Sequence, residues 1–404
     1  MGKALSGWRL TLVDQESKAA YYLHALRWFS AFYVMIYHLR PVLFKGYDQL
    51  EQKSAAIKAL YAATSIGNEF VMLFFVLSGY LIGGSVFKSV KNGNWSWKQY
   101  LLNRMTRLWT VLFSALILTY ILARVQLLLF PQFGGGFENS LNWKDFIGNL
   151  FFLQGVFFPN YGENLPLWSL SYEFWYYILF PCLVQFLAAK HVGKRIAYAI
   201  AFLIVSLVLG KSIMLYFVIW LLGAALVILP APRLPKILLA RFFVPVSIAA
   251  STVLLVLTKY VLELRGSSEF LPFASSLAVS FGFTVMIYGI LHTFDQKATA
   301  AEIKRGLHIH VVLAGFSYTL YLTHYPVINF IRVWLGDGKW GTWNPDLPHL
   351  LLALGIAVAI CLYAWVLSLV TEAKTAEVRA FFQKLLEAPA QGKNAGLDTK
   401  SHHI

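Results

Sequence analysis

Residues 26–40 constrain the fold most, because an arginine and a histidine lie inside a run that, with its flanks, is apolar and long enough to cross a bilayer. Arg27 and His38 are eleven positions apart. Eleven residues of α-helix turn through about 1100°, so both side chains lie on nearly the same face, roughly 16 Å apart along the axis. Ionisable residues in a spanning helix usually face a protein interior or a wet cavity. The spacing therefore predicts one wall of a functional site within a membrane.

The amino-acid composition excludes an ordinary soluble domain. Of the 404 residues, 58% are hydrophobic and 13% are charged, and the mean hydropathy is +0.61. A soluble domain carries about 25% charged residues. The net charge of +15 is typical of cationic cytoplasmic loops and attraction to anionic lipid in so apolar a chain. Since this explains the charge, we expect no nucleic-acid partner. Cys182 and Cys361 lie far apart without metal-ligand spacing, so we expect no metal site.

The apolar runs predict an all-α, polytopic membrane protein with about ten transmembrane helices. The predicted spans are 23–44, 62–87, 108–130, 166–189, 196–210, 212–230, 242–258, 271–294, 310–332 and 348–370. Only Lys211 separates the fifth span from the sixth. The longest predicted outer loop is 131–165, and its apolar part at 143–152 is too short to span, which predicts an interfacial or re-entrant segment.

The distribution of lysine and arginine predicts the orientation. Placing the N-terminus in the cytoplasm gives the cytoplasmic loops most of the cations, which is the bias that sets topology. Both termini are then cytoplasmic. The expected organisation is a cytoplasmic segment at 1–19, a transmembrane domain at 20–372 and a cytoplasmic polar tail at 373–404. Residues 1–19 lack the apolar core of a cleaved signal peptide, so we expect the first span to direct insertion.

Four ionisable residues on four predicted spans fall at similar depth when positions are counted from the span ends: His38, Glu69, Glu173 and His324. Pairing relieves the cost of burying such groups. A histidine paired with a carboxylate can act as a general base, because the carboxylate orients the ring and stabilises the imidazolium. The alternative is that these residues only hold the helices together, as polar interhelical contacts often do.

Arg104 and Arg107 form a second candidate site at the cytoplasmic start of the third span. Arginines three apart on a helix can grip phosphate oxygens together. The alternative is that they are ordinary cytoplasmic cations. Gly79 and Gly83, four apart in the second span, predict close packing of that helix against a neighbour.

Together these residues resemble the acyltransferase-3 family of integral-membrane O-acyltransferases. The shared features are the Arg27–His38 spacing, FFVLSGYL at 74–81, Arg104 with Arg107, WSLSYEFWYY at 168–177 and SYTLYLTHYP at 317–326. The resemblance implies a ten-helix domain that moves acyl groups from a cytoplasmic thioester donor to sugars and other acceptors. It also implies a catalytic histidine on the first helix and cytoplasmic arginines that engage coenzyme A.

Carried over to this chain, the resemblance makes His38 the catalytic histidine, with Arg27 as its partner on the same helical face and a member of the catalytic group. Glu173 matches the family's glutamate, and its role as the orienting partner of His38 is our inference from depth. His324 matches a further motif position. We expect Glu69, His324 and Tyr321 to support the site.

The same resemblance makes Arg104 and Arg107 the residues that bind the donor, with Arg27 further along the path toward His38. Acyl-CoA would be a co-substrate, and we expect no permanently bound cofactor.

These observations predict a membrane O-acyltransferase that takes an acyl group, which we expect to be acetyl, from cytoplasmic acyl-CoA. The acceptor would be a hydroxyl of a cell-envelope glycan or other saccharide, a glycolipid or another acceptor such as a small metabolite, and the expected location is the bilayer of a bacterial inner (plasma) membrane. One alternative is a proton-coupled secondary transporter or glycan flippase that uses the buried groups as a proton relay. Another is a non-catalytic membrane subunit. The sequence leaves the acceptor and the oligomeric state open.

Overall fold

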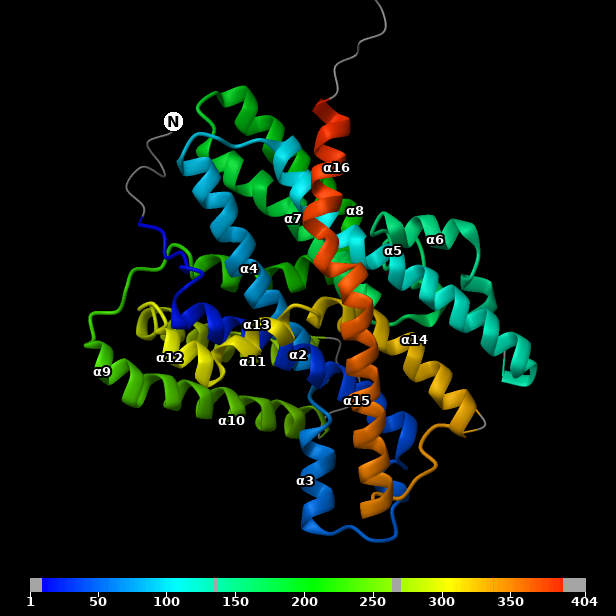
Figure 1. Ribbon diagram of the computed structural model, residues 1–404. Helices are drawn as coiled ribbons and strands as arrows, with labels where there is room; N and C mark the ends of the chain where they lie inside the picture. Colours follow the sequence, from blue (N-terminus) through cyan, green and yellow to red (C-terminus); the bar gives the residue numbers. More distant parts are fainter. Residues whose placement is uncertain (1–8, 134–136, 264–269, 337, 388–404) are drawn as a thin grey trace, which may run out of the picture.

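The computed structural model describes residues 9–133, 137–263, 270–336 and 338–387. The structure is 80% helix, with no strand among the described residues, which confirms the predicted all-α class. Figure 1 shows the helices gathered into one bundle, with α15 and α16 (orange to red) running end to end.

Several of the helices begin after residues that favour helix starts. In chain order the helices are α2 (Lys18–Leu43), α3 (Ala55–Ala63), α4 (Gly67–Lys91), α5 (Trp97–Leu129), α6 (Trp143–Leu150), α7 (Leu167–Ala188), α8 (Val192–Ala225), α9 (Lys236–Leu238), α10 (Val244–Glu263), α11 (Phe270–Thr293), α12 (Ala300–Glu302), α13 (His308–Ala314), α14 (Ser317–Gly336), α15 (Leu347–Val370) and α16 (Thr375–Glu387). The Ser17 and Ser96 hydroxyls cap α2 and α5 by accepting backbone hydrogen bonds in the first turn. A short turn, η7 (Glu372–Lys374), joins α15 to α16.

Six helical segments of the described chain are long and apolar enough to cross a membrane, or seven if the bent run from α12 to α14 is one span. The helices α2 and α7, on the predicted spans 23–44 and 166–189, contain 26 and 22 residues but are not among the six. Their polar side chains, including Arg27, His38 and Glu173, lower the mean hydropathy. The apolar helices thus support an integral membrane protein. The full count of about ten spans and the cytoplasmic termini stay predictions.

The fifth and sixth predicted spans, 196–210 and 212–230, fall largely on the two parts of α8. The helix breaks at Gly210, whose φ of 75° and ψ of 179° are not helical. A positive φ suits glycine because it lacks a Cβ. The break therefore lies one residue before Lys211, where the sequence predicts the boundary.

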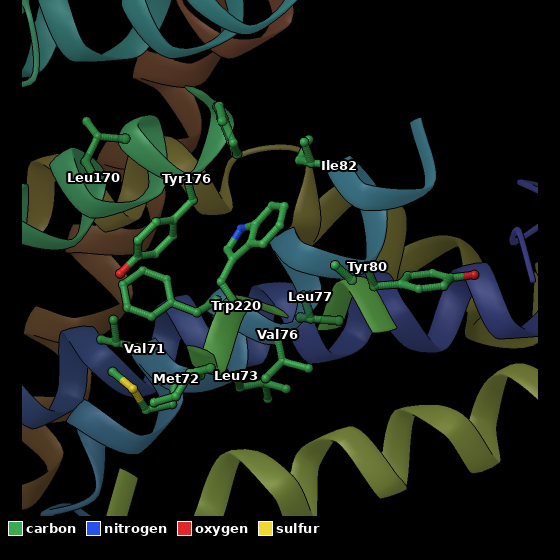
Figure 2. Packing of buried hydrophobic residues seen from close by; sticks show 14 of the residues in the cluster. Val71, Met72, Leu73, Val76, Leu77, Tyr80, Ile82, Leu170, Tyr176 and Trp220 are labelled. Carbon is green, nitrogen blue, oxygen red and sulfur yellow. The ribbon is translucent and has the colours of Figure 1, made fainter. Parts of the chain in front are cut away.

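The helix α4 packs against α8, α2, α7 and α11. Its contact with α8 requires glycine on both sides. A Cβ on Gly79 would collide with the Trp220 carbonyl oxygen, and one on Gly223 would collide with the Val76 carbonyl oxygen. Gly83 also faces α8 at close range, so the close packing predicted for Gly79 and Gly83 is confirmed. The fully buried Trp220 side chain lies among side chains of α4 and α7 (Figure 2).

The loop before α7 is folded onto that helix. Within the predicted interfacial or re-entrant segment, α6 is followed by Phe152, whose φ of 59° is uncommon for a residue with a side chain. Ser171 Oγ and Trp175 Nε1 donate to the Phe152 carbonyl oxygen at 2.7 and 3.0 Å. The Phe152 ring stacks on Phe174 with centroids 4.3 Å apart. The loop therefore braces α7, the helix that carries Glu173.

The first part of the predicted polar tail is an amphipathic helix. The helix α16 packs against α5, and Lys98 Nζ donates to the Leu386 carbonyl oxygen at 3.1 Å. Phe381, Phe382 and Leu385 are exposed, as suits a helix at a membrane interface. The prediction of a plain polar tail thus missed this helix, because its apolar residues are too few to mark a span. The rest of the tail, 388–404, lies outside the described residues.

Candidate active site

A cavity of about 90 Å³ lies among α2, α4, α5, α7 and α14. We call it the arginine cavity, because Arg27 and Arg107 both line it. The other polar lining residues are Ser78, Ser169, Glu173, Tyr177, Ser317, Tyr318 and Tyr321. A mostly apolar pocket with a few convergent polar groups is the usual form of a small-molecule site. The structure thus brings four sequence-predicted residues from four helices to one cavity.

Arg27 is held by the start of α14 and by the junction of α15 and α16. Its Nε donates to Ser317 Oγ at 3.2 Å, and its Nη2 donates to the Ala314 carbonyl oxygen at 2.5 Å. The same Nη2 pairs with Glu372 Oε1 at 3.4 Å. The other carboxylate oxygen accepts the backbone N–H of Thr319 at 3.2 Å, in the first turn of α14, where a helix favours negative charge. The Arg27 and Glu372 side chains are only 20% and 16% exposed.

Glu372 is a site residue that the sequence analysis missed. It lies two residues beyond the predicted span 348–370, at the end of the membrane where Arg27 is also expected. The available signal was an acidic residue at the last position of the predicted transmembrane domain, 20–372. Without knowing which helix ends meet, the sequence offers no reason to pair it with Arg27.

Glu173 is bound within its own helix. Its Oε1 accepts a hydrogen bond from the Tyr177 hydroxyl, one turn later, at 2.5 Å. Tyr177 also shares a hydrogen bond of 3.3 Å with Ser78 Oγ, which in turn accepts from Trp220 Nε1 at 3.2 Å. This chain of contacts fixes the Glu173 carboxylate in the wall of the arginine cavity.

Arg104 and Arg107 lie one turn apart on α5 but differ in their surroundings. Arg107 is exposed and lines the arginine cavity, whereas Arg104 is partly buried and does not. The Arg104 guanidinium lies 5.8 Å from the centre of the Tyr100 ring. Its Nε is buried and has no hydrogen-bond partner among the described residues. An unsatisfied buried donor costs about 1–3 kcal/mol, so Arg104 is ready to bind an acceptor supplied by a ligand.

His38 pairs with His324 between α2 and α14. The His38 Nδ1 and His324 Nε2 atoms are 2.9 Å apart, and His324 Nδ1 is 3.0 Å from the Leu320 carbonyl oxygen. Because a carbonyl oxygen only accepts, the proton of neutral His324 is on Nδ1, and its Nε2 is an acceptor. His38 must then donate from Nδ1. The lone pair of His38 is therefore on Nε2, where a general base would use it.

The expected contact between His38 and Glu173 is absent from the part of the chain that the structure describes. Glu173 bonds Tyr177 and His38 bonds His324. Counting depth from span ends places all of these groups at one level but cannot tell which helices are neighbours. The hydrogen-bond partner of His38 is thus an imidazole on α14 rather than a carboxylate on α7.

Tyr321 lies next to both the arginine cavity and the histidine pair. It lines the cavity and is buried, and its hydroxyl shares a hydrogen bond of 2.6 Å with Ser169 Oγ. Its ring centre is 6.1 Å from that of His324, three residues along α14. Tyr321 therefore forms part of the wall between the cavity and the two histidines.

Glu69 does not line the arginine cavity. It is buried in the first turn of α4. Two residues earlier, Gly67 meets the side chain of Tyr37, the neighbour of His38, so closely that a Cβ would collide with it. Glu69 thus lies on the helix end that packs beside the histidine pair. Among the described residues, no group of three or more His, Cys, Asp or Glu side chains could hold a metal ion.

A second cavity, of about 1020 Å³, lies along the C-terminal half of α2. We call it the aromatic cavity, and its lining residues are Tyr33, Arg40, Pro41, Phe44, Gly46, Tyr47, Gln49, Lys58, Tyr61, Ala62, Ala63, Ser65, Ile66, Thr252, Leu255, Val256, Trp340 and Gly341. The sequence analysis did not identify it, because these residues come from three separate segments with no shared motif.

Comparison with known proteins identifies the family to which this chain belongs. Residues 20–366 match the acyltransferase-3 family, described as an acyltransferase domain. An uncharacterised protein of Haemophilus influenzae is 25% identical over 144 residues, which are 35% of this chain and 58% of that protein, so the chain covers less than two thirds of that relative. No solved structure matches the chain. Since the family match extends over most of the sequence, this chain belongs to the acyltransferase-3 family of membrane acyltransferases.

Proposed function

We propose that this protein is an O-acyltransferase of the bacterial inner membrane that transfers an acetyl group from cytoplasmic acetyl-CoA to a hydroxyl of a cell-envelope saccharide. The observation that carries the proposal is the His38–His324 pair, which leaves the Nε2 lone pair of His38 available as a base. Arg27, on the same helix, lines the arginine cavity and, like His38, contacts α14. Family membership supports an acyltransferase.

The donor would be bound by Arg104 and Arg107. Guanidinium groups hold phosphate oxygens through charge-assisted, often bidentate hydrogen bonds. Arg107 is exposed at the arginine cavity, and Arg104 Nε has no partner among the described residues. The phosphates of coenzyme A would lie at these arginines, and the slender pantetheine arm would extend into the cavity past Arg27. This arrangement puts the Arg104 end of α5 and both termini on the cytoplasmic side.

His38 would act on the acceptor hydroxyl. Its Nε2 would take the hydroxyl proton as the oxygen attacks the thioester carbonyl carbon. The new carbon–oxygen bond forms, the carbon–sulfur bond breaks, and the departing thiolate takes up the proton from His38. His324 would hold the ring in the required tautomer throughout. General base catalysis of this kind supplies a factor of about 10² to 10⁴.

The proposal is tested by measuring ester-linked acetyl groups on cell-envelope saccharides. Mass spectrometry before and after mild alkali would compare cells that contain the wild-type protein, no protein, or His38→Ala at matched membrane levels. We expect an alkali-labile acetyl mass with the wild type alone. If His38→Ala acetylates as well as the wild type, the assignment of the base is wrong.

Measuring coenzyme A binding to the purified protein distinguishes the proposed acyltransferase from the transporter alternative. The acyltransferase predicts saturable binding that Arg104→Ala weakens. A proton-coupled transporter or flippase predicts no binding, and that result would favour it over the proposal.

A further inference from the structure

The aromatic cavity lies along the C-terminal half of α2, the half that carries His38, although neither His38 nor His324 lines it. Arg27 lines the arginine cavity and Arg40 lines the aromatic cavity, on one continuous helix. Thirteen helical residues separate them, about 20 Å along the axis, and His38 lies between, two residues before Arg40. A transferase whose donor comes from one side needs an acceptor site toward the other, and this cavity lies at the end of α2 that carries His38, away from the arginine cavity.

The rings of the aromatic cavity are held in fixed positions. Tyr47 and Tyr61 have ring centroids 5.6 Å apart. The Tyr61 hydroxyl donates to the Lys45 carbonyl oxygen at 2.6 Å, which fixes its ring. Tyr33 and the exposed Trp340 also line the cavity. Aromatic side chains with polar tips offer flat apolar surface beside hydrogen-bonding groups, the combination that a sugar ring with its apolar faces and hydroxyl edge requires.

The aromatic cavity is also cationic. Arg40 and Lys58 line it, and no aspartate or glutamate does among the described lining residues. The Arg40 guanidinium lies 4.8 Å from the centre of the Tyr61 ring. It makes no hydrogen bond or ion pair with any described residue, and its Nε is buried. A partly buried guanidinium without a partner is unfavourable, and a carboxylate or phosphate is the group that best matches its geometry.

We propose that the aromatic cavity binds the acceptor, and that the acceptor is a saccharide carrying an anionic group which Arg40 recognises. The inference rests on the proposed acyltransferase function and gives its acceptor a chemical class. An anion bound at Arg40 holds the sugar ring against Tyr61, at the end of α2 that carries His38.

The test measures binding without turnover. Full-length His38→Ala protein in nanodiscs of neutral phosphatidylcholine is titrated with trigalacturonate and with its methyl ester, which has the same rings without the charge. We expect the acid to bind at least about tenfold more tightly than the ester, one factor of ten being the usual scale of one good ionic contact. Added salt should reduce that preference.

Variants at Arg40 assign the preference to the cavity. In the same background, Arg40→Gln should remove the preference for the acid and leave ester binding unchanged, and Arg40→Lys should keep part of it. The matched control is Lys339→Gln, an exposed cation next to Trp340 that does not line the cavity. Equal binding of acid and ester, no binding of either, or an unchanged preference in Arg40→Gln would overturn the inference.

The headgroup of an anionic lipid is an alternative source of the negative charge that Arg40 would bind. If phosphatidylglycerol in the nanodisc abolishes acid binding, Arg40 binds a lipid headgroup and the inference is wrong. Acetyl transfer by the wild-type protein is measured separately with acetyl-CoA and both saccharides. Transfer to the neutral ester alone contradicts the inference but keeps the acyltransferase. Absence of coenzyme A binding contradicts the proposed acyltransferase function, regardless of the result of the saccharide titrations.

Discussion

His324 accepts a hydrogen bond from His38 at 2.9 Å while its own Nδ1 proton is held by the Leu320 carbonyl oxygen. One backbone carbonyl of α14 therefore sets the tautomers of both rings. In the proposed mechanism, the fully buried His324 would serve as a neutral counterpart of the carboxylate that usually orients a catalytic histidine.

Replacing His324 should lower turnover without affecting donor binding. We expect His324→Ala to reduce kcat by about 10- to 100-fold, at or below the lower end of the roughly 10²- to 10⁴-fold that a whole acid–base group supplies, because His38 remains but loses its orienting acceptor. His324→Gln can place an amide oxygen near the former Nε2 and should retain more activity. Steady-state kinetics should show a lower kcat with an unchanged KM for acetyl-CoA. A selective rise in KM would contradict the orienting role.

Arg104→Ala should weaken binding of coenzyme A through its phosphates. We expect a loss of about tenfold or more, since a charge-assisted hydrogen bond contributes about 1.5–3 kcal/mol. Isothermal titration with coenzyme A and with pantetheine, which lacks the phosphates, checks the cause, because pantetheine binding should not change. Arg124→Ala, on the same helix but outside the arginine cavity, is the control. Equal losses for both ligands would argue against phosphate recognition.

Glu372→Gln should destabilise the protein and loosen Arg27. Removing one partner of a largely buried ion pair leaves the other uncompensated, so we expect a loss of about 1–3 kcal/mol. The exposed Lys374–Glu377 pair offers a matched control, because Glu377→Gln should cost less than about 1 kcal/mol. Thermal unfolding in detergent compares the two variants. Equal stability would show that the Arg27–Glu372 contact is dispensable.

Gly223→Ala should disrupt the packing of α8 on α4. The added methyl group would collide with the Val76 carbonyl oxygen, a backbone atom that cannot move aside alone. Overpacking of this kind costs about 1–3 kcal/mol, and we expect the upper end. Gly355→Ala, on α15 with no atom within 4 Å of the new Cβ, should cause no loss. Comparing the unfolding temperatures of the two variants tests this prediction, and a Gly223→Ala variant as stable as the wild type would contradict the inferred contact.

Residue spacing was enough to predict the face of the first helix but not its partners. Arg27 and His38 both reach α14 from α2, as two side chains on one helical face should. Which group meets His38 depends on helix neighbours and their register, and neither follows from depth alone. Glu173 was therefore a chemically suitable partner for His38, although in the structure its carboxylate accepts a hydrogen bond from Tyr177.

The same site residues limit what hydropathy can predict. The polar groups of α2 and α7 lower the apolar signal of two helices that carry the site. The aromatic cavity is assembled from residues far apart in the chain, so it becomes visible only when the fold brings them together.

The ion pair between Arg27 and Glu372 has an electrostatic consequence for the donor. Arg27, Arg107 and Glu173 line the arginine cavity, and Glu372 pairs with Arg27 from outside that lining. Formal electroneutrality of these four groups leaves little attraction for phosphate, while the polar groups still suit amides and a thioester. If the donor is acyl-CoA, as proposed, its charged nucleotide would be kept at the entrance and its uncharged arm admitted, so the cavity would separate the two parts of one molecule.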